Sequence, residues 1–122
     1  PFIRTAEMYL IKAEALNEIN NGPNRAAKDA LNAVRHRAGL GDTPASSYAD
    51  FKKAVLAERR VEFAMEGHRW HDLVRMCSLD EMKQLVGAAK TGVVPRDANY
   101  LFPIPNNDII MSNGRLTQND GY

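Results

Sequence analysis

Carboxylates, arginines and histidines are concentrated in one stretch of the chain, ERRVEFAMEGHRWHDLVRM, which runs from Glu58 to Met76. Side chains of these types at close spacing can form a general acid and base pair, a metal site, or a network of ion pairs that joins helices. Which of these chemistries applies depends on the elements that position the stretch.

Glu58 and Glu62 are four residues apart in a helix that we expect to run from Ser47 to Glu66. A helical projection places both on the apolar arc of that helix, together with Phe51, Ala54, Val55, Val61 and Met65. Burying a lone ionised carboxylate costs several kcal/mol, so each glutamate needs a cation. We therefore expect bidentate arginine pairs that hold helices together, and the candidate partners are Arg59, Arg69, Arg75, Arg4 and Arg35.

Two catalytic or metal-binding interpretations compete with these ion pairs. The carboxyl groups of Glu58 and Glu62 have a spacing that would also suit the acid and base of a glycosidase, roughly 5 to 9.5 Å apart. His68 and His71 can share a helix face beside an acidic residue, although their HxxH spacing is not that of an HExxH metalloprotease. Because buried charges and histidines beside acids are more often structural, we favour ion pairing, with no catalytic residue and no metal.

Aromatic and nucleophilic residues add one candidate for ligand binding. Trp70 shares helical spacing with apolar neighbours, which favours packing over a sugar-stacking role. Tyr100 lies in a loop-rich segment and is the tyrosine that we expect to be available to a ligand. Cys77 is expected on the apolar side of a helix, where a thiol is inert, and the chain has no GxSxG motif and no phosphate-binding glycine loop.

Helical periodicity covers most of the chain. The first helix is expected from Arg4 to Ile19. A wide arc of this helix is expected to be buried, and the residues on that arc include Tyr9, Met8, Ile11 and Ile19. Asn20-Asn21-Gly22-Pro23 ends it, Asn24 caps a second helix that ends at Gly39, and these two helices form an antiparallel pair. Ser47-x-x-Asp50 and Ser78-x-x-Glu81 resemble capping boxes that open the third and fifth helices, and a short fourth helix carries Trp70 and Cys77.

The composition indicates one soluble globular domain. The chain has 122 residues, of which 44% are hydrophobic and 25% charged, and its net charge is +1. That charge gives no field that would select a nucleic acid, and no run approaches the roughly 20 apolar residues of a membrane span. We expect a single domain over 1–122, with a helical part at 4–90 and a loop-rich tail at 91–122, where prolines and asparagines exclude a long helix. Since no initiator methionine or signal peptide is present, we expect a portion excised from a longer protein.

Three blocks of the sequence resemble the SusD/RagB family of outer-membrane lipoproteins from Bacteroidetes. The stretch from Glu58 to Met76 is similar to the family segment E-R-R-x-E-[FL]-[AF]-x-E-G-x-R-[WF]-x-D-L-x-R. AEMYLIKAEALNEI with ALNAVRHRAGL resembles the preceding helix pair of the family, and LFPIPNNDIIMSNGRLTQNDGY its closing segment. The positions that match the signature are Glu58, Arg59, Arg60, Glu62, Glu66, Gly67, Arg69, Trp70, Asp72 and Arg75.

The resemblance implies a mainly α-helical protein built from tetratricopeptide-like antiparallel helix pairs, with an extended tail rich in proline and asparagine. Family members are lipid-anchored at the cell surface of the outer membrane, capture oligosaccharides or other nutrients, and pass them to a SusC-like TonB-dependent transporter. They are binding proteins without a cofactor, and most glycan contacts precede the portion that this chain matches. Asp120 replaces the usual proline of the closing motif, and His71 stands where an aromatic residue is common.

Two functional hypotheses follow. The first is the scaffold portion of a glycan- or nutrient-binding protein of this family. The second is a tetratricopeptide-like module that binds a protein segment and no glycan. The tail favours the first hypothesis, because a repeat array would continue with helices or a polar capping helix.

Overall fold

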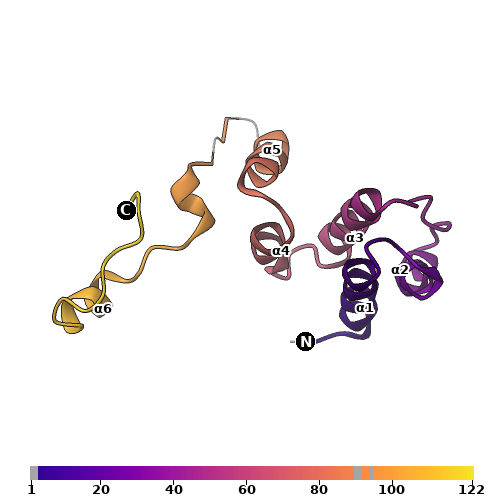
Figure 1. The fold of residues 1–122 in the computed structure, drawn as a ribbon, viewed down its shortest axis with the longest axis horizontal. Coiled ribbons are helices and arrows are strands. Elements are labelled where there is room, and N and C mark those ends of the chain that lie inside the picture. The colour runs from indigo at the N-terminus through magenta and orange to yellow at the C-terminus, as the bar shows by residue number, and fades with distance from the viewer. Residues whose placement is uncertain (1–2, 90–91, 94) are drawn as a thin grey trace. The chain divides into compact units, whose positions relative to one another are not determined.

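The computed structural model describes residues 3–89, 92, 93 and 95–122, and within these ranges the chain forms helices and no strand (Figure 1). The prediction of a mainly α fold is confirmed. The expected border between the helical part and the tail, at residues 90 and 91, lies outside the described residues. The elements are α1 (Thr5–Ile19), α2 (Arg25–Arg37), α3 (Tyr48–Glu62), α4 (His68–Met76), α5 (Leu79–Ala89), a 3-10 helix η1 (Asp97–Tyr100) and α6 (Asn106–Met111).

The chain packs as two compact units, residues 1–72 and 73–122. The division falls inside α4 and not at the expected start of the tail. In the first unit α1 contacts both α2 and α3, and these three helices make its core. Among the described residues no helix combines the length and the apolar character that crossing a bilayer requires.

The turn between α1 and α2 has the chemistry that the sequence predicts. Asn21 adopts the left-handed conformation, with φ 48°, which asparagine tolerates better than most residues. The Gly22 N–H donates to Asn17 O at 3.0 Å and closes the end of α1. Asn24 caps α2, since its Oδ1 accepts from the Ala27 N–H at 2.8 Å.

The buried face of α1 is narrower than the sequence predicts. Leu10, Ala13 and Asn17 are buried at helical spacing, whereas the side chains expected to widen the buried arc are exposed: Met8, Tyr9, Ile11 and Ile19. One position of the buried face is also polar. The Asn17 amide donates to Tyr48 O at 3.2 Å, so a hydrogen bond between α1 and α3 replaces an apolar contact there.

The start of α3 agrees with the sequence prediction and also ties α3 to α1. Ser47 Oγ accepts from the Asp50 N–H at 3.1 Å, which confirms Ser47 as the N-cap. The Tyr48 hydroxyl lies 2.8 and 2.7 Å from the two carboxylate oxygens of Glu18. This hydrogen bond, followed by partial burial and the negative charges of Glu18 and Glu14, raises the pKa of Tyr48.

The end of α3 differs from the prediction, because the helix stops at Glu62 and not at Glu66. Turns follow, in which Met65 and Gly67 have φ values of 66° and 82°. Once the chain leaves the helical path, a helical projection no longer gives the direction of side chains. Met65, expected on the buried arc, lies in these turns and is 103% exposed. Val61 is still within α3 but on the side opposite Phe51 and Val55, so it is 75% exposed and its predicted burial is wrong.

In the second unit the predicted cap of α5 is confirmed. The Ser78 N–H donates to Glu81 Oε2 at 2.9 Å, and the Glu81 N–H donates to Ser78 Oγ at 3.3 Å, which makes a reciprocal capping box. Cys77, expected on the fourth helix, lies just beyond its end and is half-buried. Farther along, Asp97 forms a hydrogen-bonded ion pair with Lys83. The hydrogen bond to Asp97 raises the pKa of Lys83, and the opposing effect of burial is smaller.

The tail combines extended chain with turns, as the prolines predict, and it adds the short helices η1 and α6 that the sequence analysis did not identify. Gln118 and Asn119, near the end of the chain, form hydrogen bonds with the backbone of Phe102 and Ile104. The Gln118 side chain bonds both backbone groups of Ile104, accepting from N at 2.8 Å and donating to O at 2.9 Å. Asn119 Nδ2 donates to Phe102 O at 2.7 Å. At Gly121 (φ 90°) a Cβ atom would lie 2.6 Å from Ala98 Cβ, so this turn requires glycine.

Candidate functional site

The carboxylates of the Glu58 to Met76 stretch lie in a network of ion pairs in the first unit, which we call the ion-pair cluster. It joins residues of α2, α3 and α4, the turn after α3 and the residue that precedes α1. Its members are the acids Glu58, Glu62, Glu66 and Asp72 and the arginines Arg4, Arg35, Arg37 and Arg59.

Glu62 is the most connected acid of the cluster. Arg4 Nη1 donates to its Oε1 at 2.9 Å, and Arg37 forms an ion pair with its other oxygen. Arg4 also donates from Nη2 to the backbone oxygen of Glu62 at 2.8 Å. The Glu62 side chain, 8% exposed, thereby joins the end of α3 to the start of α1 and the end of α2.

Arg4 makes the bidentate contact, and it does so with Glu66. Its Nε and Nη2 donate to Glu66 Oε2 and Oε1 at 3.2 and 2.7 Å. Burial alone would lower the pKa of Arg4, but the hydrogen bonds to Glu62 and Glu66 outweigh that effect and raise it. The prediction of arginine pairing is confirmed, whereas the prediction that Glu58 and Glu62 take the bidentate pairs is wrong.

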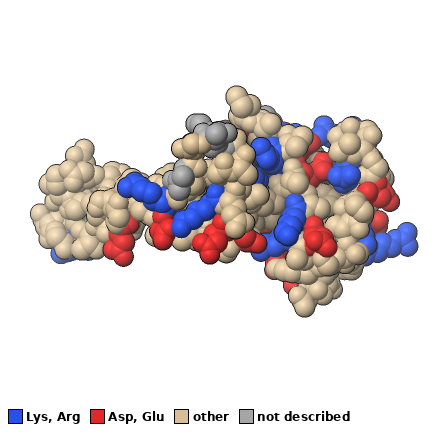
Figure 2. Space-filling view, turned by 90° about the horizontal axis from the view of Figure 1, so that it is seen from above, with Lys and Arg blue, Asp and Glu red and all other residues tan. Residues whose placement is uncertain are grey.

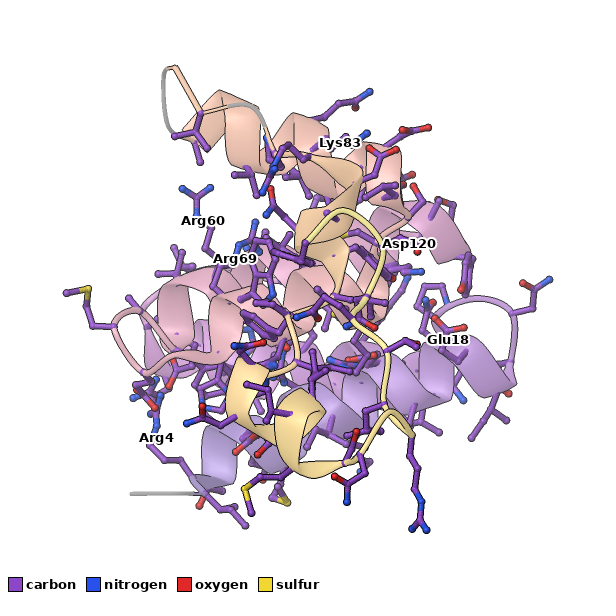
Figure 3. All side chains as sticks on the ribbon, turned by 90° about the vertical axis from the view of Figure 1, so that its left-hand side faces the viewer. Arg4, Glu18, Arg60, Arg69, Lys83 and Asp120 are labelled. Atoms are coloured by element: carbon purple, nitrogen blue, oxygen red, sulfur yellow. The ribbon has the colours of Figure 1, made fainter. Side chains whose placement is uncertain are left out.

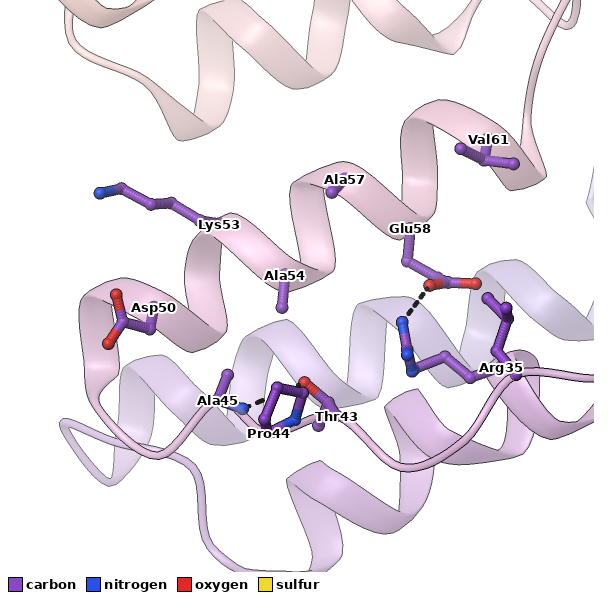
Figure 4. Close-up of a pocket in the computed structure, with 11 residues that line it drawn as sticks. Arg35, Thr43, Pro44, Ala45, Asp50, Lys53, Ala54, Ala57, Glu58 and Val61 are labelled. Atoms are coloured by element: carbon purple, nitrogen blue, oxygen red, sulfur yellow. Dashed lines mark hydrogen bonds and ion pairs between the residues drawn. The ribbon is translucent and has the colours of Figure 1, made fainter.

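Glu58 is held by one arginine of α2. Arg35 Nη1 lies 3.2 Å from Glu58 Oε2, and Arg35 Nε donates to Gly41 O at 2.9 Å (Figure 4). The pair fixes α3 against α2 and also fixes the loop that follows α2. Arg37 was not among the expected partners, because nothing in the sequence shows that the last turn of α2 reaches the end of α3.

Arg59 and Asp72 form the most deeply buried pair of the cluster. Arg59 Nη2 lies 2.9 Å from Asp72 Oδ1, and the two side chains are 4% and 5% exposed. The guanidinium carbon of Arg59 is also 5.0 Å from the centre of the Phe63 ring, and that of Arg4 is at the same distance. Phe63 therefore contacts two cations, which the ring face attracts electrostatically.

The histidines do not form a metal site within the described residues, where no group of three or more potential ligands occurs. His68 Nδ1 lies 3.9 Å from Glu7 Oε1, and its ring centre is 4.8 Å from that of Phe63. His71 is exposed. His68 thus has neighbours that suit a structural role beside the ion-pair cluster.

The other candidate residues are dispersed. Arg69 and Trp70 are half-buried on α4, and Arg75 is exposed near its end. Arg60 extends from α3 into solvent (Figure 3). In the second unit the half-buried Tyr100 donates its hydroxyl to Val74 O at 2.6 Å, which leaves the ring for any ligand contact. The binding role expected for Tyr100 stays a prediction.

The ion-pair cluster is built to hold elements together. The carboxylates of Glu58 and Glu62 accept from arginines, which stay protonated at physiological pH and do not exchange protons with a substrate. Over the face drawn in Figure 2, acidic and basic side chains are intermixed, so charge does not mark a single ligand-binding patch there.

Replacement of Glu58 by alanine tests the role of its pair with Arg35. We expect Glu58→Ala to lower the free energy of unfolding by about 2 kcal/mol, because a half-buried guanidinium loses a charged acceptor. Urea denaturation of the purified protein measures this change. Asp29→Ala, which removes a carboxylate of α2 that is 69% exposed, is the control and should cost less. An unchanged midpoint for Glu58→Ala would show that this pair does not stabilise the fold.

Together, the helices and the cluster define an all-helical scaffold whose connections are stabilised by arginine–carboxylate pairs. A model of the SusD family matches residues 1–122. The chain belongs to the SusD family, which confirms the resemblance seen in its sequence.

The similar proteins are longer than this chain. The SusD-like protein P2 of Formosa agariphila is 30% identical over 98% of this chain and 25% of its own length. The starch-binding protein SusD of Bacteroides thetaiotaomicron is 32% identical over 100% of this chain and 21% of its own length. The chain therefore spans about a quarter of the length of these relatives.

Solved structures agree with this fold. A SusD homolog from Bacteroides thetaiotaomicron superposes with a TM-score of 0.78 at 31% identity, over 99% of this chain and 26% of that one. Surface glycan-binding protein A from the same organism gives a TM-score of 0.71 at 28% identity, over 94% of this chain and 23% of that one.

Proposed function

We propose that this chain is the scaffold portion of a cell-surface protein that binds glycans or other nutrients. In this role it supports delivery of oligosaccharides to a SusC-like TonB-dependent transporter of the outer membrane, where a lipid anchor holds the protein. The observation that carries the proposal is the family match over residues 1–122, together with relatives whose names describe binding of starch and of surface glycans.

The ion-pair cluster supports a scaffold role and not a catalytic one. A hydrolase of the retaining or inverting type needs two carboxyl groups that flank a substrate. Here Glu58 and Glu62 are directed at Arg35, Arg4 and Arg37, and their oxygens serve contacts between helices. The proposed protein is therefore a binding protein, and its rigid frame keeps other binding segments in place.

The proposal is tested by binding of the purified protein to a panel of soluble polysaccharides, measured by affinity electrophoresis. We expect retardation by at least one glycan, release of that glycan unchanged, and copurification with a TonB-dependent transporter from outer membranes. Tyr100→Ala and Tyr100→Phe form a matched pair, since only the first removes the ring. Failure to bind any glycan and to copurify with a transporter would overturn the proposal, and shortened glycan products would overturn the non-catalytic part.

A further inference from the structure

Two asparagine–glycine pairs occur in the sequence, Asn21-Gly22 after α1 and Asn113-Gly114 after α6. Both asparagines adopt the left-handed conformation, with φ values of 48° and 53°, and both are exposed, so water reaches each of them. Among the described residues neither asparagine side chain takes part in a hydrogen bond or an ion pair. The two pairs are therefore alike in conformation, exposure and side-chain freedom.

An asparagine–glycine pair can react with itself. The backbone nitrogen of the glycine lies close in the chain to the side-chain carbonyl carbon of the asparagine, and attack on that carbon closes a five-membered ring. A glycine in this position favours the attack, because it has no side chain to hinder it and its backbone rotates freely. The reaction also needs the glycine nitrogen to leave its own hydrogen bond, so the bonding of that N–H decides how readily each pair reacts.

The backbone nitrogen of Gly22 is held by the core of the first unit. Its N–H donates to Asn17 O at 3.0 Å, and the buried Asn17 is itself bonded to Tyr48 O at the start of α3. Rotation about the backbone of Asn21, which brings the Gly22 nitrogen toward the side chain, turns its N–H away from Asn17. Attack at Asn21 therefore breaks a hydrogen bond and is slowed by its loss.

The backbone nitrogen of Gly114 is not held in this way. Within the described residues its N–H has no hydrogen-bond acceptor. The turn is closed by two neighbouring bonds, from Arg115 N to Ser112 O at 3.3 Å and from Leu116 N to Ser112 Oγ at 3.0 Å. Neither of these bonds uses the Gly114 nitrogen, which is therefore free to approach the side chain of Asn113.

We propose that Asn113 is a site of spontaneous deamidation, in which the Gly114 nitrogen attacks the side-chain carbonyl carbon of Asn113. A bond forms between these two atoms, the bond from that carbon to the side-chain nitrogen breaks, and the nitrogen takes the Gly114 proton and leaves as ammonia. Water then opens the cyclic imide at one of its two carbonyl carbons and gives aspartate or isoaspartate. Asn21 reacts about two- to tenfold more slowly, the factor by which the loss of one hydrogen bond lowers a rate.

The reaction alters the loop between Ile104 and Gln118. Both products carry a negative charge that asparagine lacks, and isoaspartate also adds a carbon atom to the main chain. The Gln118 side chain bonds to both backbone groups of Ile104 and so ties the two ends of this loop together. The change at Asn113 therefore stays within the loop, and the deamidated protein keeps its fold. The inference does not depend on the proposed binding of glycans.

The test follows both asparagines in the purified full-length protein, kept in mildly alkaline buffer below its unfolding temperature. Peptides are taken at intervals, and mass spectrometry with fragmentation locates each conversion of an amide to an acid. We expect Asn113 to convert about two- to tenfold faster than Asn21, with isoaspartate among the products. In concentrated urea the hydrogen bond of Gly22 is lost, so the two rates should become equal.

Asn113→Gln and Asn21→Gln form a matched pair, since glutamine keeps the amide but closes the ring far more slowly. The first variant should lose the fast conversion, the second should keep it, and circular dichroism verifies that both fold. Equal rates in the folded protein, or faster conversion at Asn21, would overturn the inference. So would a difference that persists in urea, or conversion of Asn113 in urea alone. Glycan retardation is measured separately, so its failure leaves this result interpretable.

Discussion

Asp72→Ala is expected to lower the free energy of unfolding by about 3 to 5 kcal/mol, since it leaves a buried guanidinium without its carboxylate. Asp72 is the acid that pairs with Arg59 among the described residues, and the two side chains are almost fully buried. Arg59 Nε and Nη1 already lack a hydrogen-bond partner there. The guanidinium therefore has no second acceptor that could replace Asp72.

Urea denaturation with a second probe, near-UV circular dichroism around Trp70, measures the loss caused by Asp72→Ala. Asp72→Asn is the matched control, because it keeps an acceptor and removes the charge, and it should cost less. The double variant Arg59→Met/Asp72→Leu removes both charges and should recover part of the stability, as apolar replacements of buried ion pairs often do. A loss below about 1 kcal/mol for Asp72→Ala, the range of exposed pairs, would show that the pair is solvated.

Local features of the fold were predictable from the sequence because their physical causes lie within a few residues. Asn24, Ser47 and Ser78 cap helices since an oxygen side chain sits three residues before an unpaired N–H. The left-handed turn at Asn21 likewise follows from its own residue type. Each of these predictions needed no knowledge of how the helices pack.

Features that depend on packing between helices were harder to predict. Asn17 is buried with its amide donating to Tyr48 O, and a polar residue outside the expected apolar stripe gives no signal of such burial in the sequence. The early end of α3 cannot be read from its periodicity, since Phe63 still falls four residues after the buried Arg59, as a continuing helix would place it. The need of Glu58 and Glu62 for cations was predictable from burial cost, and Arg4 and Arg35 were among the expected partners, but Arg37 was not.

Phe63 stands at the centre of these contacts, and its replacement should be as costly as that of Asp72. We expect Phe63→Ala to lower the free energy of unfolding by about 3 to 5 kcal/mol, the range for large-to-small changes in a core. The side chain is 3% exposed, and its ring contacts the guanidiniums of Arg4 and Arg59 and the imidazole of His68. The cavity would leave these polar groups beside a void, where they lose both packing and attraction to the ring.

Phe63→Leu separates the two contributions, because leucine keeps most of the apolar volume and has no aromatic face. If volume dominates, Phe63→Leu should cost about 1 kcal/mol and Phe63→Ala the full amount. If the two cation–ring contacts dominate, the leucine variant should lose about 2 kcal/mol or more, and Phe63→Tyr should lose little. Both outcomes are measured by urea denaturation, and a change below about 1 kcal/mol for Phe63→Ala would contradict the placement of this ring between Arg4 and Arg59.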